Sequence, residues 1–190
     1  MGKLLLYTSL VLSALLVPAS AMAAQSDVID NEAKVNYAEK SGFAWGVNAG
    51  SSIDLTSNDL STLNADVYFG VRTPTVTMAA LGAGIHAMVS NSGRIYPVYA
   101  MLRTSFSKKP RLCFLDLRAG IAFSTLPGSP GQRSFYGAPS LGIRLASGRS
   151  FSSYVTVGYT FIGLKSFGTA KDHKNLNGLS MASIGIGISF

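Results

Sequence analysis

The chain has 190 residues with a formal net charge of +7, and 13% of its residues are charged. This length predicts one domain, and the charged fraction lies well below the ~25% that is usual for soluble domains. The 20 Gly and the single long apolar run exclude a bundle of membrane-spanning helices, and the lone Cys113 excludes an internal disulfide. No cluster of Lys and Arg lies on a predicted helix, so we expect no nucleic-acid partner despite the basic balance.

The first 23 residues have the layout of a secretory signal peptide. Met1-Gly2-Lys3 supplies a positive start, an apolar run follows over 4–17, and Ala21-Met22-Ala23 is an A-x-A cleavage site, with cleavage after Ala21 as the alternative. The run is shorter than the ~20 apolar residues that a spanning helix needs. Residues 24–40 carry charge without a sustained period, so we interpret them as a periplasmic N-terminal leader and place the folded domain at 41–190.

Eight segments of the folded domain alternate between bulky apolar residues and small or polar residues. A period of two predicts strands with two different faces. Their lengths suit the ~9–11 residues that a tilted strand needs to cross a bilayer. The predicted strands are 42–52, 62–73, 76–89, 94–106, 111–124, 135–146, 150–164 and 180–190.

The connections between these strands alternate in length. Those at 73–75, 107–110 and 147–149 are short. Three of the four intervening connections, at 53–61, 125–134 and 165–178, are longer, while 90–93 is short. Short periplasmic turns and longer external loops are typical of outer-membrane barrels.

The last strand, SMASIGIGISF, shows the clearest alternation, because Ile184, Ile186, Ile188 and Phe190 share one face and Gly and Ser fill most of the other. Small residues fit a crowded interior, so we expect the bulky face to contact lipid. An alternating strand that ends on Phe resembles the terminal strand of Gram-negative outer-membrane β-barrels. The pattern over 41–190 is similar to the small eight-stranded group that includes outer-membrane protein X and porin-like proteins.

This resemblance implies an all-β fold, namely a closed antiparallel up-and-down transmembrane β-barrel of eight strands, located in the cell outer membrane. In that family the outer-membrane assembly machinery recognises the last strand, which gives Ile184, Ile186, Ile188 and Phe190 the role of an assembly signal. The implied partners are this machinery, outer-membrane lipid and lipopolysaccharide, and the implied state is a monomer. The competing fold is a soluble barrel of the lipocalin type, in which the bulky face would line a ligand cavity.

Charged residues on the inward faces form a predicted lumen charge network: Asp66, Arg72, Arg103, Asp116, Arg118 and Arg144. One interpretation is a basic constriction that selects anions. The other is a packed plug of salt bridges, which is favoured because eight strands enclose a lumen that side chains can fill. In the last loop, Lys165, Lys171 and Lys174 would suit the phosphates of lipopolysaccharide.

No active site can be derived from the histidines. His86 is followed by Ala87-Met88 and faces inward, so it lacks the His-x-Ser pair of outer-membrane lipid A deacylases, and His173 lies in a predicted loop. No spacing indicates a metal or cofactor site. We therefore expect an integral outer-membrane barrel with a structural or surface-interaction role and no catalysis. A narrow passive pore for small, preferentially anionic solutes is the alternative, and a lipid A-modifying enzyme is the third.

Overall fold

The computed structural model describes residues 42–56, 60–73, 77–90, 92–106, 112–126, 129–147, 151–164, 166–167, 174–175 and 178–190. The predicted signal peptide at 1–23 and the predicted leader at 24–40 lie outside these residues. Within the described part of the chain, no helix is long and apolar enough to cross a membrane.

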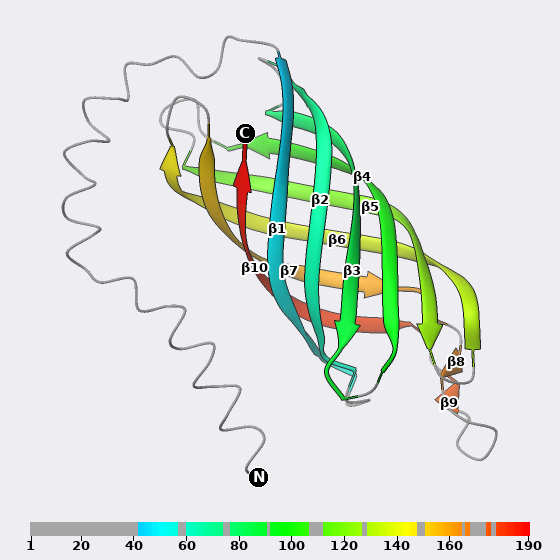
Figure 1. The fold of residues 1–190 in the computed structure, drawn as a ribbon. Helices are drawn as coiled ribbons and strands as arrows, with labels where there is room; N and C mark the ends of the chain where they lie inside the picture. Colours follow the sequence, from blue (N-terminus) through cyan, green and yellow to red (C-terminus); the bar gives the residue numbers. More distant parts are fainter. Residues whose placement is uncertain are drawn as a thin grey trace. The chain divides into compact units, whose positions relative to one another are not determined.

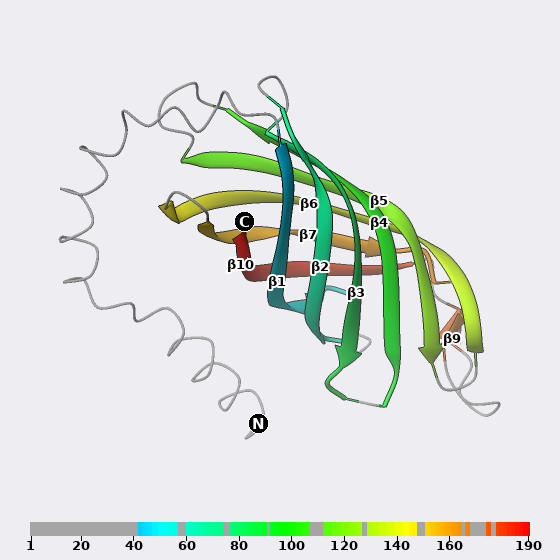
Figure 2. The ribbon, with the colours of Figure 1, turned by 45° about the horizontal axis from the view of Figure 1, so that its top comes forward.

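The described residues form eight long strands: β1 (Gly42–Asp54), β2 (Thr62–Arg72), β3 (Met78–Met88), β4 (Arg94–Ser105), β5 (Cys113–Leu126), β6 (Ser129–Ser147), β7 (Ser152–Ile162) and β10 (Leu179–Ser189). Neighbouring strands are antiparallel, and the order β1-β10-β7-β6-β5-β4-β3-β2 closes on itself. Figures 1 and 2 show the tilted strands wrapping around a common axis. The predicted closed antiparallel barrel of eight strands is therefore confirmed.

The barrel closes between β1 and β10, which pair from Gly46↔Ser189 to Asp54↔Met181. Because unpaired backbone groups cannot be left open to hydrocarbon, this closure is what allows a sheet to span a membrane. We call the end of the barrel that holds Gly42 and Phe190 the terminal rim, at the upper end of Figure 1. The opposite end, which holds Asp54 and Leu179, is the loop rim.

The predicted loop at 125–134 is wrong. β5 continues to Leu126 and β6 already begins at Ser129, so the connection comprises residues 127–128. The segment is rich in Pro, Gly and Ser, which favour loops, yet its backbone still pairs with β5. An irregularity in register beside Thr125 accommodates this composition, because Gly131 adopts a φ of 77°, a conformation that side chains disfavour.

The predicted loop at 165–178 contains a small element of regular structure. β8 (Ser166–Phe167) and β9 (Lys174–Asn175) pair with each other as a separate two-stranded sheet.

The two faces of the barrel wall differ as the sequence pattern predicts. Outward positions are apolar along the middle of every long strand, and many of their large side chains are exposed. Outward aromatic residues gather near both rims: Phe43, Trp45, Phe69, Phe106, Phe151 and Phe190 toward the terminal rim, and Tyr96, Phe123, Phe135, Tyr159 and Phe161 toward the loop rim. An apolar band between two aromatic girdles is the surface of a transmembrane barrel. The lipocalin-type alternative, with the bulky face inside, is excluded by this orientation.

The inward face combines glycine with large aromatic rings. Several glycines lie directly across from an aromatic residue of a neighbouring strand, among them Gly46 from Tyr68, Gly82 from Tyr99, Gly142 from Phe114 and Gly187 from Tyr154. A Cβ atom at any of these glycines would overlap the ring opposite. The small residues on the inward face therefore leave the space in which the aromatic side chains fill the lumen.

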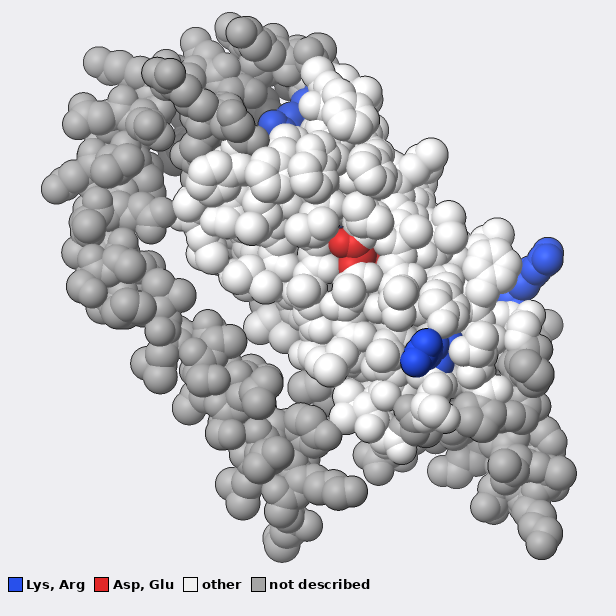
Figure 3. Space-filling model, viewed as in Figure 1, with Lys and Arg blue, Asp and Glu red and all other residues white. Residues whose placement is uncertain are grey.

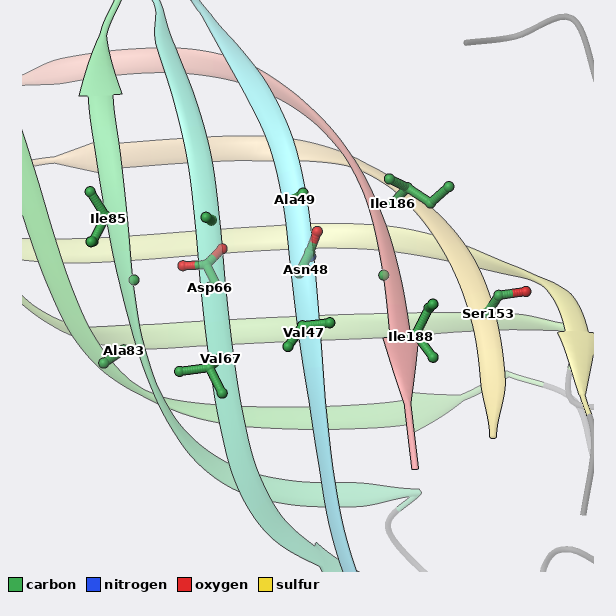
Figure 4. Close-up of a pocket in the computed structure, with 13 residues that line it drawn as sticks. Val47, Asn48, Ala49, Asp66, Val67, Ala83, Ile85, Ser153, Ile186 and Ile188 are labelled. Carbon is green, nitrogen blue, oxygen red and sulfur yellow. The ribbon is translucent and has the colours of Figure 1, made fainter. Parts of the chain in front are cut away.

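A hollow lies in the outer wall over β1, β2, β3 and β10 (Figure 4). Small outward residues, including Ala49, Ala65 and Ala83, make the wall thin here, and Ile85 and Ile186 flank them. Almost all of the lining is apolar, although Asp66 lies at the floor. The hollow thus continues the apolar band and brings lipid close to the charged interior.

Candidate functional site

The candidate site is a cluster of charged side chains in the middle of the lumen, formed by Asp66, His86, Arg103, Asp116 and Arg118 from β2, β3, β4 and β5. The period of two places Asp116 and Arg118 on the same inward face. The antiparallel register sets Arg103 directly opposite Asp116. All five side chains are buried, and Asp116 has no exposed surface.

Asp116 is the centre of the cluster. Its Oδ2 atom accepts hydrogen bonds from Nη2 of Arg103 at 2.7 Å and from Nε at 3.3 Å. Its Oδ1 atom accepts from Nε of Arg118 at 3.3 Å, and Nη1 of Arg118 donates to Oδ2 of Asp66 at 3.2 Å. Two carboxylates thus neutralise two guanidiniums, which is the condition under which buried charges are tolerated.

His86 extends the cluster beyond the predicted network. Its Nε2 atom lies 3.4 Å from Oδ1 of Asp66. The sequence prediction placed His86 on the inward face but did not include it in the network. The missing signal was register, because Asp66 pairs with Gly84, and His86 follows Gly84 on the same face. His86 Nδ1 and the Tyr99 hydroxyl are buried without a partner among the described residues.

Aromatic rings surround the two guanidiniums. The guanidinium carbon of Arg103 lies 4.5 Å from the ring centre of Phe114 and 4.4 Å from that of Tyr154. That of Arg118 lies 5.3 Å from the ring centre of Tyr99. Cation–π attraction is strongest where water is absent, so the rings add to the ion pairs in holding both cations.

Two residues of the predicted network lie elsewhere. Arg72 is near the terminal rim, where its Nη2 atom donates to the carbonyl oxygen of Phe190 at 3.1 Å and to Oγ of Ser189 at 3.3 Å. Arg144 is half-buried on β6 and takes no part in the ion pairs of the cluster. Arg72 therefore contacts the barrel seam, a contact that depends on the closing register of β1 and β10.

A small polar cavity of about 40 Å³ adjoins the cluster on the side of the loop rim. Its lining includes Asn48, Asn64, His86, Arg118 and Thr156. A cavity of this size and polarity has room for ordered water. Beyond it, apolar side chains fill the lumen at the loop rim, each at most 6% exposed: Leu60, Met88, Ile95, Leu126, Ile162, Leu164, Leu179 and Met181.

The predicted assembly signal lies along the outer face of β10 at the seam. Ile186, Ile188 and Phe190 are exposed, and Ile184 is half-exposed. Phe190 exchanges backbone hydrogen bonds with Trp45, and the two rings stack at 4.5 Å between centroids. Recognition of this strand by assembly machinery stays a prediction.

The remaining candidate residues give no further site. Lys165, Lys171 and His173 lie outside the described residues, and the side chain of Lys174 is not described. In the described part of the chain, no group of three or more His, Cys, Asp or Glu is arranged to hold a metal ion.

Comparison with solved structures identifies the fold. Neisserial surface protein A matches with a TM-score of 0.58 and 14% identity over 80% of this chain and 98% of that protein. The N-terminal β-barrel domain of OprF from Pseudomonas aeruginosa matches with a TM-score of 0.47 and 15% identity, covering 80% of this chain and all of that domain (100%). No family model and no curated protein matches the sequence.

The likeness to Neisserial surface protein A concerns the fold, and the apolar band and aromatic girdles are properties of this chain itself. Together they confirm the closed eight-stranded barrel with an apolar outer wall that the alternating sequence pattern predicted. The protein is a small eight-stranded transmembrane β-barrel with the fold of Neisserial surface protein A.

Proposed function

We propose that the protein is a closed, non-conducting barrel of the outer membrane, with a structural or surface-interaction role and no catalysis. The observation that carries this proposal is the buried cluster, in which Asp116 pairs with Arg103 and Arg118, and Arg118 reaches from β5 to Asp66 on β2. A selective passage would need charges that an entering ion can reach. Here each guanidinium already has a carboxylate partner, so the cluster offers no net positive charge to an anion.

The layers on either side of the cluster support the same proposal. Toward the loop rim, the buried apolar side chains of the described residues give a hydrated ion no polar partner to replace its water. Toward the terminal rim, the hydroxyls of Tyr68 and Tyr154 are 2.8 Å apart and join across the lumen. An ion would have to displace both layers and break paired charges in between, which favours a structural barrel over a pore.

Single-channel recording in planar lipid bilayers tests the closed lumen. Folded protein, identified by a different gel mobility before and after boiling, is expected to insert without producing conductance steps. Reproducible anion-selective steps from the same folded preparation would contradict the proposal and support the narrow pore.

The proposed absence of catalysis has a separate test. His86 is turned toward Asp66 inside the barrel, away from the lipid face on which a lipid-modifying enzyme would need it. Mass spectrometry of lipid A from cells that overproduce the protein is expected to match that from control cells. A new acylation or deacylation product that depends on the protein would show that it is an enzyme.

A further inference from the structure

Among the described side chains of the eight long strands, two charged ones are exposed at outward positions. Arg94, at the start of β4, and Arg133, on β6, both face outward and are exposed. The three described acidic residues, Asp54, Asp66 and Asp116, all lie at inward positions. Figure 3 shows basic residues toward the ends of this face and an acidic patch in its middle, and Asp66 lines the hollow in this wall. The exposed charged side chains that point outward from the long strands are therefore these two arginines, and both lie toward the loop rim.

The two arginines flank β5 at the level of the aromatic girdle. Arg133 pairs with Phe123, and its guanidinium carbon lies 5.7 Å from the centre of that ring. On the other side of β5, Thr125 donates a hydrogen bond to the backbone carbonyl of Arg94 at 3.3 Å. The guanidiniums are thus attached to the rim of the apolar band rather than to a free loop.

The wall beside Arg133 leaves room at Gly131. This glycine precedes Arg133 by two residues at the irregularity in β6, and a Cβ atom added to it would meet nothing within 4 Å. An irregularity of this kind changes the direction of the side chains that follow it. Neither guanidinium forms an ion pair with a described residue.

We propose that Arg94 and Arg133 bind the phosphate groups of lipid headgroups that surround the barrel at the loop rim. Guanidinium donors match phosphate oxygens in charge and in bidentate geometry. A side chain at a girdle lies where hydrocarbon gives way to headgroups, so the phosphate that it meets belongs to a lipid. This inference deepens the proposed surface-interaction role and rests on it, but it does not depend on a closed lumen.

The test measures lipid binding to the folded full chain in detergent by native mass spectrometry. The probes are lipid A with two phosphate groups, the same lipid with the phosphates removed, and inorganic phosphate. The variants are Arg94→Gln, Arg133→Gln and the double variant. Arg72→Gln is the matched control, because it removes the same charge at the opposite rim, and each variant must keep the gel mobility of a folded barrel.

We expect each single variant to weaken binding of phosphorylated lipid A about five-fold, because one basic residue near an anionic membrane surface contributes about that factor to affinity. The double variant should weaken binding roughly 25-fold. Arg72→Gln should bind phosphorylated lipid A as tightly as the wild type does. The dephosphorylated lipid should bind equally to the wild type and to the Arg94 and Arg133 variants. Equal binding by wild type and the double variant, or an equal loss in Arg72→Gln, would overturn the proposal. Saturation of the site by millimolar inorganic phosphate would overturn its assignment to lipid. Conductance would be unchanged in every variant, so failure here is distinguishable from failure of the closed lumen.

Discussion

Arg103 is the residue on which the interior of the barrel depends most directly. It makes two hydrogen bonds to Asp116 and lies over the rings of both Phe114 and Tyr154. Replacing it with Gln removes the charge and leaves Asp116 with Arg118 as its remaining cation. Breaking a buried pair in this way costs about 3–5 kcal/mol. We expect Arg103→Gln to lower the free energy of unfolding by that amount, measured by urea titration of the folded barrel.

Two further substitutions separate charge from geometry. Arg103→Lys keeps the positive charge but loses the planar fork and the stacking, so we expect an intermediate loss of stability. Arg94→Gln makes the same chemical change as Arg103→Gln at an exposed side chain, and it should alter stability by less than about 0.5 kcal/mol. Similar losses in Arg103→Gln and Arg94→Gln would mean that the lumen is hydrated and that the cluster does not hold it together.

Glycine at position 142 is a second decisive residue. A Cβ atom there would overlap the ring of Phe114, and that ring cannot easily move. It lies edge-on to Tyr154 at 5.5 Å between centroids and beneath the guanidinium of Arg103. We expect Gly142→Ala to destabilise the barrel by about 1–3 kcal/mol, the usual cost of overpacking.

Gly42→Ala is the control for this prediction, because a Cβ atom at Gly42 would meet nothing within 4 Å. Both substitutions add one methyl group to a glycine in a strand, so the effect on the unfolded chain is the same. An equal change in unfolding free energy for the two variants would show that the aromatic packing in the lumen is loose.

Among the elements, β10 carries the predicted assembly role, and the structure suggests how to test it. Phe190 stacks on Trp45 of β1, and such a pair is worth about 0.5–1.5 kcal/mol beyond its buried area. Phe190→Asp removes the stack and places a charge on the strand that must pair with β1 last. We expect less folded protein in the outer membrane, with export across the inner membrane unchanged, measured by fractionation and gel mobility.

Phe151→Asp provides the comparison for that experiment. Phe151 is an exposed aromatic residue toward the same rim, immediately before β7, and it is not part of the terminal strand. If Phe151→Asp reduces insertion as much as Phe190→Asp, the effect belongs to the aromatic girdle in general. The assembly signal at Ile184, Ile186, Ile188 and Phe190 would then lose its support.

The strands and their faces were predictable because one physical rule acts on every residue of a membrane barrel. Each outward side chain meets lipid and each inward one meets a narrow lumen, so the period of two survives along the whole chain. The rule fails where the chain leaves the bilayer. There, the Pro-Gly-Ser composition of 125–134 predicted a loop, but backbone pairing continued through it.

The composition of the charge cluster was harder to predict than its position on the inward faces. Parity alone placed Asp66, Arg103, Asp116 and Arg118 inside, and cross-strand register then decided which of them meet. Register also brought His86 to Asp66 and took Arg72 to Phe190. No local pattern encodes register between strands that are joined by connections of variable length, so these partners required the structure.

The molecule as a whole reverses the polarity of a soluble protein. A cluster of charged side chains is buried inside it, while large apolar side chains form the wall, as the exposed Leu81, Leu141 and Val157 illustrate. In water such a continuous apolar surface would drive association. In a bilayer this surface is in contact with lipid. The loss of stability caused by a charged substitution there depends on its depth in the bilayer rather than on its exposed fraction.

Val157 and Ile53 allow this dependence on depth to be measured at constant exposure. Val157 lies at the middle of β7 and is 60% exposed, whereas Ile53 lies beside the loop rim and is 61% exposed. A lysine at the midplane of a bilayer costs about 2–4 kcal/mol, and one near the interface costs about 0–1 kcal/mol. We therefore expect Val157→Lys to lower the unfolding free energy in phospholipid bilayers by about 2–4 kcal/mol, and Ile53→Lys to lower it by less than about 1 kcal/mol. If the wall faced water instead, two equally exposed lysines would cost equally little, and equal unfolding midpoints for the two variants would contradict the transmembrane assignment.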